Sequence, residues 1–196
     1  MTAPKHARVS DPARVRALAH PVRLELMDHL RRVEEATATE CAQEVGESVA
    51  SCSFHLRQLA KYGFVEPAER RGREKPWRLA GTELDVAPGE TPGSLSAVTE
   101  YAGLQTLHEV ERFRAFLGQA ATESAEWIEA STLLRAELWA TAEELVGLRE
   151  AIRALLDPFR EREADPRERP AGARRSHLFA TINPAPGAAG EPGDRS

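Results

Sequence analysis

The sequence predicts a mainly helical fold with a small amount of β-sheet (α+β), and two observations lead to this class. Apolar residues recur at helical intervals of three to four positions in several segments of the chain. Just after Gly63 the spacing changes to that of short extended segments. The chain has 196 residues, enough for one good core or for a small core followed by a second module.

Composition restricts the class of protein and the compartment. Apolar residues make up 41% of the chain and charged residues 29%, as in soluble globular proteins. No run approaches the ~18–20 apolar residues that a membrane span needs, and residues 1–10 lack the apolar stretch of a secretory signal. Two cysteines, Cys41 and Cys52, fit a reducing compartment. A cytoplasmic protein with no membrane partner is therefore expected.

Two helices are expected near the amino terminus. Asp11 before Pro12 is a helix cap that opens a short helix to about Leu18. His20-Pro21 then restarts the chain as a second helix. Its buried face is marked by residues one turn apart: Val22, Leu26 and Leu30.

A second pair of helices follows, separated by a glycine-containing turn. Thr39 is the expected cap of a helix over residues 40–45, which Gly46 ends. Ser48 is the expected cap of the next helix, which runs to Tyr62. The buried side of this helix is expected to carry Val49, Cys52, Leu56, Leu59 and Ala60. Its open side is expected to carry Ala50, Ser51, Phe54, His55, Gln58 and Lys61.

A β-ribbon is expected after these helices. Residues 64–69 and 74–79 are predicted strands, joined by a turn at 71–73. Pro67 and Pro76 suit an edge ribbon, where a missing backbone donor costs little. Two helices joined by a turn and followed by a ribbon give the order of a winged helix-turn-helix domain, which we place at residues 11–80.

The rest of the chain divides by composition. Residues 1–10 are expected to be a flexible N-terminus, 81–94 a Pro/Gly-rich linker, and 184–196 a disordered tail. Residues 95–183 are expected to form a helical/αβ module that joins two protomers into a homodimer.

The expected module begins with a helix over residues 95–119. After it, the capping box Thr141-x-x-Glu144 opens another helix, which Asp157-Pro158 should stop. Residues 131–139 could be helix or strand, and strand is favoured because a capped helix begins straight after them. Residues 176–182 are a predicted short strand. The dimerisation face is assigned to the apolar stripe of the first helix: Leu104, Leu107, Val110, Phe113 and Leu117.

Charge is unevenly distributed along the chain. The net charge is −5, yet basic residues gather between Arg70 and Arg78 while the second half is acidic. A local basic stripe matters more than the total for phosphate binding, because exposed charges are screened over ~8–10 Å. The local stripe fits double-stranded DNA as the partner, and the two protomers of a dimer would bind it at a pseudo-palindromic operator.

The helix after Ser48 is the expected reader of bases. A helix fits the major groove, where short hydroxyls such as Ser51 and Ser53 approach base edges and long basic side chains reach phosphates. The arginines of the wing suit the DNA backbone or minor groove. The expected DNA-binding residues are Ser48, Ala50, Ser51, Ser53, Phe54, His55, Arg57, Gln58, Lys61, Arg70, Arg71, Arg73 and Lys75.

Five motifs in order give this region a family resemblance. They are Ala19-His20-Pro21-Val22-Arg23-Leu24, Thr39-Glu40-Cys41-Ala42, Ser53-Phe54-His55-Leu56-Arg57-Gln58-Leu59, Gly63-Phe64-Val65 and Arg71-Gly72-Arg73-Glu74. Over about residues 11–80 the chain resembles the DNA-binding domain of ArsR-type winged-helix repressors. The resemblance implies a homodimeric, sequence-specific transcription regulator, usually a repressor released by an effector.

The signal that such a regulator would sense is left open. Metal-sensing members of the family carry a Cys-x-Cys pair where this chain has Cys41 alone, so no metal or other cofactor is expected. No nucleophile–base pair or phosphate loop has motif context, so no enzyme is expected. A small-molecule or redox effector remains an alternative, as does a winged helix that binds another protein instead of DNA.

Individual side chains also keep two interpretations. Phe54 could touch thymine methyls or pack on the second helix. The two cysteines are interpreted as core thiols, with a redox switch as the alternative. Trp127 and Trp139 could line an effector pocket or simply pack.

Overall fold

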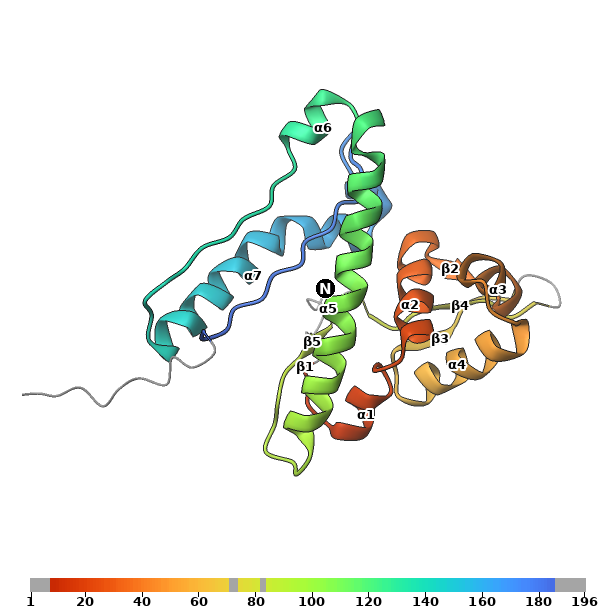
Figure 1. Ribbon diagram of the computed structural model, residues 1–196. Coiled ribbons are helices and arrows are strands. Elements are labelled where there is room, and N and C mark those ends of the chain that lie inside the picture. Colours follow the sequence, from red (N-terminus) through yellow and green to blue (C-terminus); the bar gives the residue numbers. More distant parts are fainter. Residues whose placement is uncertain (1–7, 71–73, 82–83, 186–196) are drawn as a thin grey trace, which may run out of the picture. The chain divides into compact units, whose positions relative to one another are not determined.

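The computed structural model describes residues 8–70, 74–81 and 84–185 (Figure 1). The chain divides into two compact units, residues 1–128 and 129–196. The fold is mainly helical with small sheets, which confirms the predicted α+β class. No helix of the described residues is long and apolar enough to cross a membrane.

Five helices form most of the described part of the first unit. They are α1 (Pro12–Arg16), α2 (Pro21–Val33), α3 (Ala38–Val45), α4 (Val49–Lys61) and α5 (Ser94–Gln119). Helix α2 packs against both α3 and α4, while α5 packs mainly against α1. The short 3₁₀ turn η1 (Ala120–Thr122) and α6 (Ala125–Glu129) follow α5 and lead to the second unit.

The wing is part of a three-stranded sheet. Its strands lie in the order β2 (Glu35–Ala36), β4 (Trp77–Leu79), β3 (Val65–Pro67), and both pairings are antiparallel. The two predicted ribbon strands are thus present, although shorter than expected. Strand β2 was not predicted, and its pairing makes β4 the central strand. Pro67 lies on the edge strand, and Pro76 precedes β4, so neither removes a donor from the centre of the sheet.

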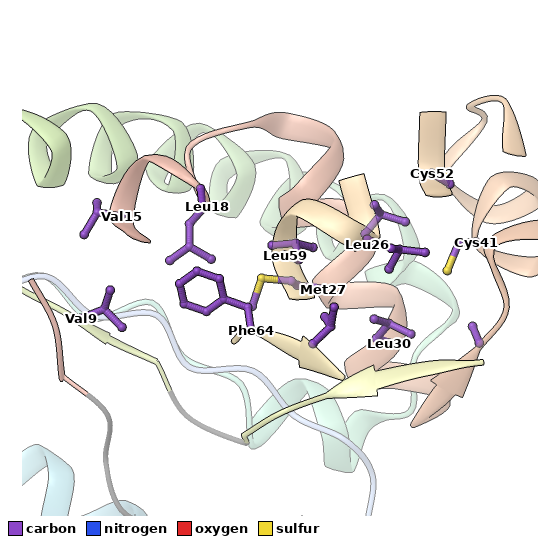
Figure 2. Close-up of a cluster of buried hydrophobic side chains, with 14 of the residues drawn as sticks. Val9, Val15, Leu18, Leu26, Met27, Leu30, Cys41, Cys52, Leu59 and Phe64 are labelled. Atoms are coloured by element: carbon purple, nitrogen blue, oxygen red, sulfur yellow. The ribbon is translucent and has the colours of Figure 1, made fainter. Parts of the chain in front are cut away.

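The core of the first unit is continuous from the helices to the wing (Figure 2). Leu18, Leu26, Leu30, Leu56 and Leu59 are fully buried. Phe64 and Val65, at the start of the wing, belong to the same cluster. The wing is therefore attached to the helices through apolar packing.

The cap of α3 differs from the prediction. Thr37, rather than Thr39, is the N-cap: its hydroxyl oxygen accepts from the Glu40 amide at 3.2 Å, and the Glu40 carboxylate accepts from the Thr37 amide at 2.6 Å. This reciprocal pair is a capping box, which satisfies two backbone donors at once. Thr39 lies inside the helix and is exposed.

Residues 8–10 of the predicted flexible N-terminus and residues 85–94 of the predicted linker are paired with each other. Strand β1 (Arg8–Val9) pairs in parallel with β5 (Asp85–Val86). Val9 is 1% exposed and joins the core. Ser94 Oγ donates to the carbonyl of Ser10 at 2.6 Å and accepts from the Gly89 amide at 2.9 Å. The predicted linker therefore brings α5 into the first unit, and the boundary between units falls near residue 128.

The second unit contains one long helix and no strand among its described residues. Helix α7 (Ala142–Ala164) begins after Thr141, whose side chain forms the predicted capping box with Glu144. It continues through Pro158, contrary to the predicted stop, and η2 (Pro166–Glu168) follows. Pro158 and Ala154 are exposed, so water can bind the carbonyl that the proline leaves unpaired.

The two strands predicted in the second unit are wrong for this structure. Residues 131–139 and 176–182 have irregular backbone. Local alternation of apolar residues makes a strand only where a second strand offers backbone partners. Leu133, Leu134 and Trp139 are 81%, 84% and 106% exposed, so these three apolar side chains lie outside any core.

Candidate nucleic-acid interface

Helices α3 and α4 are joined by a tight turn of three residues. Gly46 ends α3 with a φ of 73°, in the left-handed region that favours glycine, and its amide donates to the carbonyl of Ala42 at 3.1 Å. Ser48 begins α4, as predicted, and its Oγ accepts from the Ser51 amide at 3.1 Å. This geometry is that of a helix-turn-helix, with α4 as the second helix.

The first half of α4 presents small side chains to solvent. Ser48 and Ala50 are exposed, and Ser51 and Ser53 are half-buried. Phe54 is 49% exposed. Small and hydroxyl side chains at this end let a helix approach base edges closely.

The second half of α4 carries longer polar side chains. Arg57 and Lys61 are exposed, and Gln58 is half-buried. Arg57 Nε donates to the carbonyl of Ser53 at 3.0 Å, which keeps the guanidinium along the helix. Val49, predicted to be buried, is the first residue of α4 and is 46% exposed.

His55 is the main correction to the predicted reading face. It is 8% exposed, and its ring centroid lies 4.5 Å from that of His20. Arg23 Nε donates to His55 Nδ1 at 3.4 Å. The side chain therefore faces the start of α2 instead of solvent. The Phe54 ring packs edge-on against the His55 ring, with the ring centroids 5.3 Å apart. Phe54 is therefore both exposed to solvent and packed on His55.

The environment of this pair favours neutral imidazoles. Burial, followed by the charge of Arg23, lowers the pKa of His20, and the nearby Glu47 carboxylate opposes this. Burial lowers the pKa of His55 as well, with further contributions from His20 and Arg23. Sequence reasoning placed His20 correctly at the start of α2, but the contact with His55 depends on residues 35 positions apart and has no local signal.

The wing supplies the remaining predicted contacts. Arg70 and Lys75 are exposed, and Lys75 Nζ lies 6.0 Å from the centre of the Trp77 ring. Arg71 and Arg73, together with the predicted turn at 71–73, lie outside the described residues. Arg78 belongs to the basic stripe of the sequence, but it pairs with Glu66 across the ribbon at 2.7 Å. The positive charge that the wing offers to DNA therefore depends on Arg70, Lys75 and the two arginines outside the described residues.

The predicted dimerisation stripe is mostly open. Leu107 is 65% exposed, Val110 41%, Phe113 39% and Leu117 53%. Leu104 is half-buried. Phe116, absent from the prediction, is 36% exposed and stacks on Phe113 with ring centroids 6.1 Å apart. These side chains form an apolar face on the second half of α5.

The cysteines lie in the core, as predicted. Cys41 and Cys52 are both 0% exposed and free of disulfide (Figure 2). Burial raises the pKa of Cys41 to about 12 and also raises the pKa of Cys52. Such thiols hold little of the thiolate that reacts with oxidants. Across the described residues, no group of three or more His, Cys, Asp or Glu side chains is placed to hold a metal ion.

Comparison with known proteins agrees with this geometry. Residues 18–68 match the model of a family described as a helix-turn-helix domain. The match runs from the end of α1 through β3 and includes α3, the turn and α4. It confirms the predicted helix-turn-helix for this part of the chain. No curated protein matches the chain significantly.

Solved structures with similar sequences include one protein from Mycobacterium bovis. Its crystal structure, a fragment of a possible transcriptional regulatory protein, is 26% identical and covers 50% of this chain and 89% of its own, with a TM-score of 0.34. The solution structure, described as a homodimeric winged helix-turn-helix DNA-binding domain of a possible ArsR-family regulator, is 26% identical and covers 55% and 91%, with a TM-score of 0.34.

A more distant similarity involves a transcription regulator of a Staphylococcus aureus multidrug efflux pump. It is 14% identical and covers 71% of this chain and 78% of its own, with a TM-score of 0.28. These TM-scores are low, so the assignment depends on the family match and the geometry of α3 and α4. The chain therefore contains a helix-turn-helix DNA-binding domain of the transcription-regulator type.

Proposed function

We propose that this protein is a sequence-specific, homodimeric repressor of transcription that reads a pseudo-palindromic operator through α4. The observation that carries the proposal is the surface of α4, where small side chains occupy the first half and exposed basic ones the second. This order matches a helix that enters the major groove at its amino-terminal end and meets phosphates farther along.

Each group of residues has its own role in this proposal. Ser51 and Ser53 contact base edges, and Phe54 meets a thymine methyl group. Arg57, Lys61 and the wing residues bind phosphates or enter the minor groove. These wing residues are Arg70, Arg71, Arg73 and Lys75.

Dimerisation supplies the affinity that one domain lacks. One such domain contacts few bases, whereas two on one duplex roughly double the contact free energy, with half-sites about 10–10.5 base pairs apart. The exposed apolar face of α5 is the proposed interface. Binding to DNA would place the protein in the cytoplasm of a bacterium.

The test is selection of DNA by the full chain. A random-sequence duplex library is incubated with the protein at about pH 7.5, and recovered duplexes are sequenced and footprinted. We expect one enriched motif with two inverted half-sites about one helical turn apart. Recovery of no motif, together with equal binding of all duplexes, would contradict sequence-specific reading.

A protein-interaction module is the second candidate function, favoured by the acidic second half of the chain. The same experiment separates it from the first, because a protein-binding winged helix would retain no duplex even at low salt.

The phosphate contacts of the first candidate are tested by the double variant Arg71→Gln/Arg73→Gln. This variant should weaken binding to every duplex and lower the salt dependence by about one unit of slope per lost phosphate contact.

A further inference from the structure

The start of α2 and the middle of α4 meet in a cluster formed by His20, Arg23 and His55, which we call the imidazole cluster. The two rings lie 4.5 Å apart and are tilted by 43°. Arg23 Nε donates to His55 Nδ1 at 3.4 Å. Phe54, which is exposed on the reading face, touches the His55 ring. The cluster therefore joins a core helix to the surface proposed to read DNA.

The hydrogen bond from Arg23 determines the protonation state of His55. A guanidinium has only donors, so Nδ1 of His55 can accept only while it carries a lone pair. The ring is then neutral, with its proton on Nε2. Arg23 cannot easily turn away, since its Nη1 donates to the carbonyl of Ala17 at 2.7 Å.

His20 also favours the neutral form. Its Nδ1 is buried and has no hydrogen-bond partner among the described residues. A positive charge on this half-buried ring, whose Nδ1 lacks an acceptor, would cost more than the neutral ring does. Protonation of His20 would also bring a cation against the His55 ring.

Few charged groups face the cluster. Arg23 comes from α2 and Glu47 from the turn before α4, and His20 acts on His55. Tyr62, at the end of α4, acts on Arg23. Burial and Arg23 outweigh Glu47 at His20, and burial, His20 and Arg23 outweigh it at His55, so the pKa of both imidazoles lies below its ordinary value of about 6.5.

We propose that His20, Arg23 and His55 position the recognition helix α4 for DNA only while both imidazoles are neutral, so that mild acid weakens DNA binding. Protonated rings would stand beside Arg23 as like charges in a partly buried site. The middle of α4 then separates from α2, and Ser53, Phe54 and Arg57 move with it. The inference rests on the proposed function, since it concerns how the reading helix is held.

The predicted direction opposes the general effect of acid on DNA-binding proteins. Added protons make a protein more positive and normally strengthen its attraction to phosphates. Here the affinity for DNA should decrease as the pH is lowered from about 6.5. The imidazoles bind protons more readily when α4 has separated from α2, so acid favours that conformation over the one that binds DNA. The limiting slope is about tenfold per pH unit for each proton taken up.

The test measures affinity of the full chain for a duplex selected at about pH 7.5, by fluorescence anisotropy at constant ionic strength from about pH 8 to pH 5. The variant His20→Phe/His55→Asn keeps a ring beside α4 and an acceptor for Arg23, but neither side chain titrates. We expect this variant to lose the fall in affinity, and His55→Asn alone to lose part of it.

His29 provides a matched control. It lies on α2 with Nδ1 3.2 Å from Arg32 Nη2, three residues along the helix, and burial lowers its pKa too. It lies next to Glu44 and Glu40 of α3 rather than α4. The His29→Asn variant should therefore keep the fall in affinity seen in the wild type.

The outcomes separate this inference from the function on which it rests. Affinity that stays constant or rises in acid, or that falls equally in the double variant, would overturn the inference alone. Ordinary pKa values for His20 and His55, measured by NMR titration of the free protein, would also overturn it. Failure to recover any duplex at about pH 7.5 would overturn the proposed function and this inference with it.

Discussion

Nε2 of His108 lies 2.8 Å from Oδ2 of Asp28, and this contact joins α5 to α2. The same carboxylate oxygen accepts from Arg112 Nη1 at 2.5 Å, and the other oxygen accepts from Arg31 Nη1 at 3.0 Å. One half-buried aspartate therefore holds three basic side chains. It connects the helix that carries the proposed dimer face to the core of the DNA-binding domain.

Replacement of Asp28 tests the strength of this connection. Asp28→Asn leaves His108, Arg112 and Arg31 close together without the carboxylate that balances them. We expect the free energy of unfolding to fall by about 1.5–3 kcal/mol, the range for hydrogen bonds to charged groups. Urea denaturation measures the change. Glu111→Gln is the control, because Glu111 forms an exposed pair with Arg114 and should change stability by less than about 1 kcal/mol.

The same pair predicts a pH dependence of stability. The hydrogen bond to Asp28 raises the pKa of His108, although burial opposes it. The pKa of His108 is higher in the folded chain than in the unfolded chain. The contact with Asp28 therefore stabilises the fold fully below about pH 6.5, and this stabilisation is lost as the pH rises through the pKa of the folded chain. The stability difference between wild type and His108→Gln should therefore shrink from about pH 6 to pH 9. A constant difference over this range would show that His108 contributes no charge to the contact.

The cap of α3 gives a prediction with a control two residues away. Thr37→Ala removes the hydroxyl oxygen that accepts from the Glu40 amide and should lower the free energy of unfolding by about 0.5–2 kcal/mol. Thr39 is exposed within the same helix, so Thr39→Ala should be near neutral. Equal losses in the two variants, measured by thermal denaturation, would contradict the assignment of Thr37 as the cap.

These elements illustrate what could be predicted from the sequence. Local signals located α2, α4 and α5 correctly, because apolar periodicity and caps act over a few residues. The pattern Thr37-x-x-Glu40 was present too, yet Thr39 was chosen as the cap. Strand β2 was missed because its two residues owe their conformation to pairing with β4, more than 40 positions away.

The reading face was predicted in part, and its errors have a physical cause. Small and basic side chains were placed correctly on the open side of α4. His55 was placed there as well because it is polar, but a ring contact with His20 and a hydrogen bond from Arg23 bury it. In the second unit, residues 131–139 and 176–182 form no strand, because alternation makes a strand only where a second strand pairs with it, which no local pattern could supply.

The apolar face of α5 predicts how the oligomeric state responds to a charge. Leu107→Glu would place a carboxylate in the proposed interface, where burial without a partner is costly. We expect dimers to dissociate to monomers in sedimentation experiments at micromolar concentration. Thr106→Glu is the control, because Thr106 is the exposed neighbour of Leu107 outside the apolar stripe. Dimers that survive Leu107→Glu unchanged would place the interface elsewhere.

The most direct test of the account is the DNA affinity of Ser51→Ala/Ser53→Ala. It is measured by fluorescence anisotropy at one fixed salt concentration, on the selected duplex and on a scrambled duplex of equal length. Ser96→Ala, an exposed serine of α5, is the control. The account predicts a loss of about 1–3 kcal/mol on the selected duplex alone, since base contacts specify and phosphate contacts position. Equal affinity of the variant and wild type for the selected duplex would contradict reading by α4.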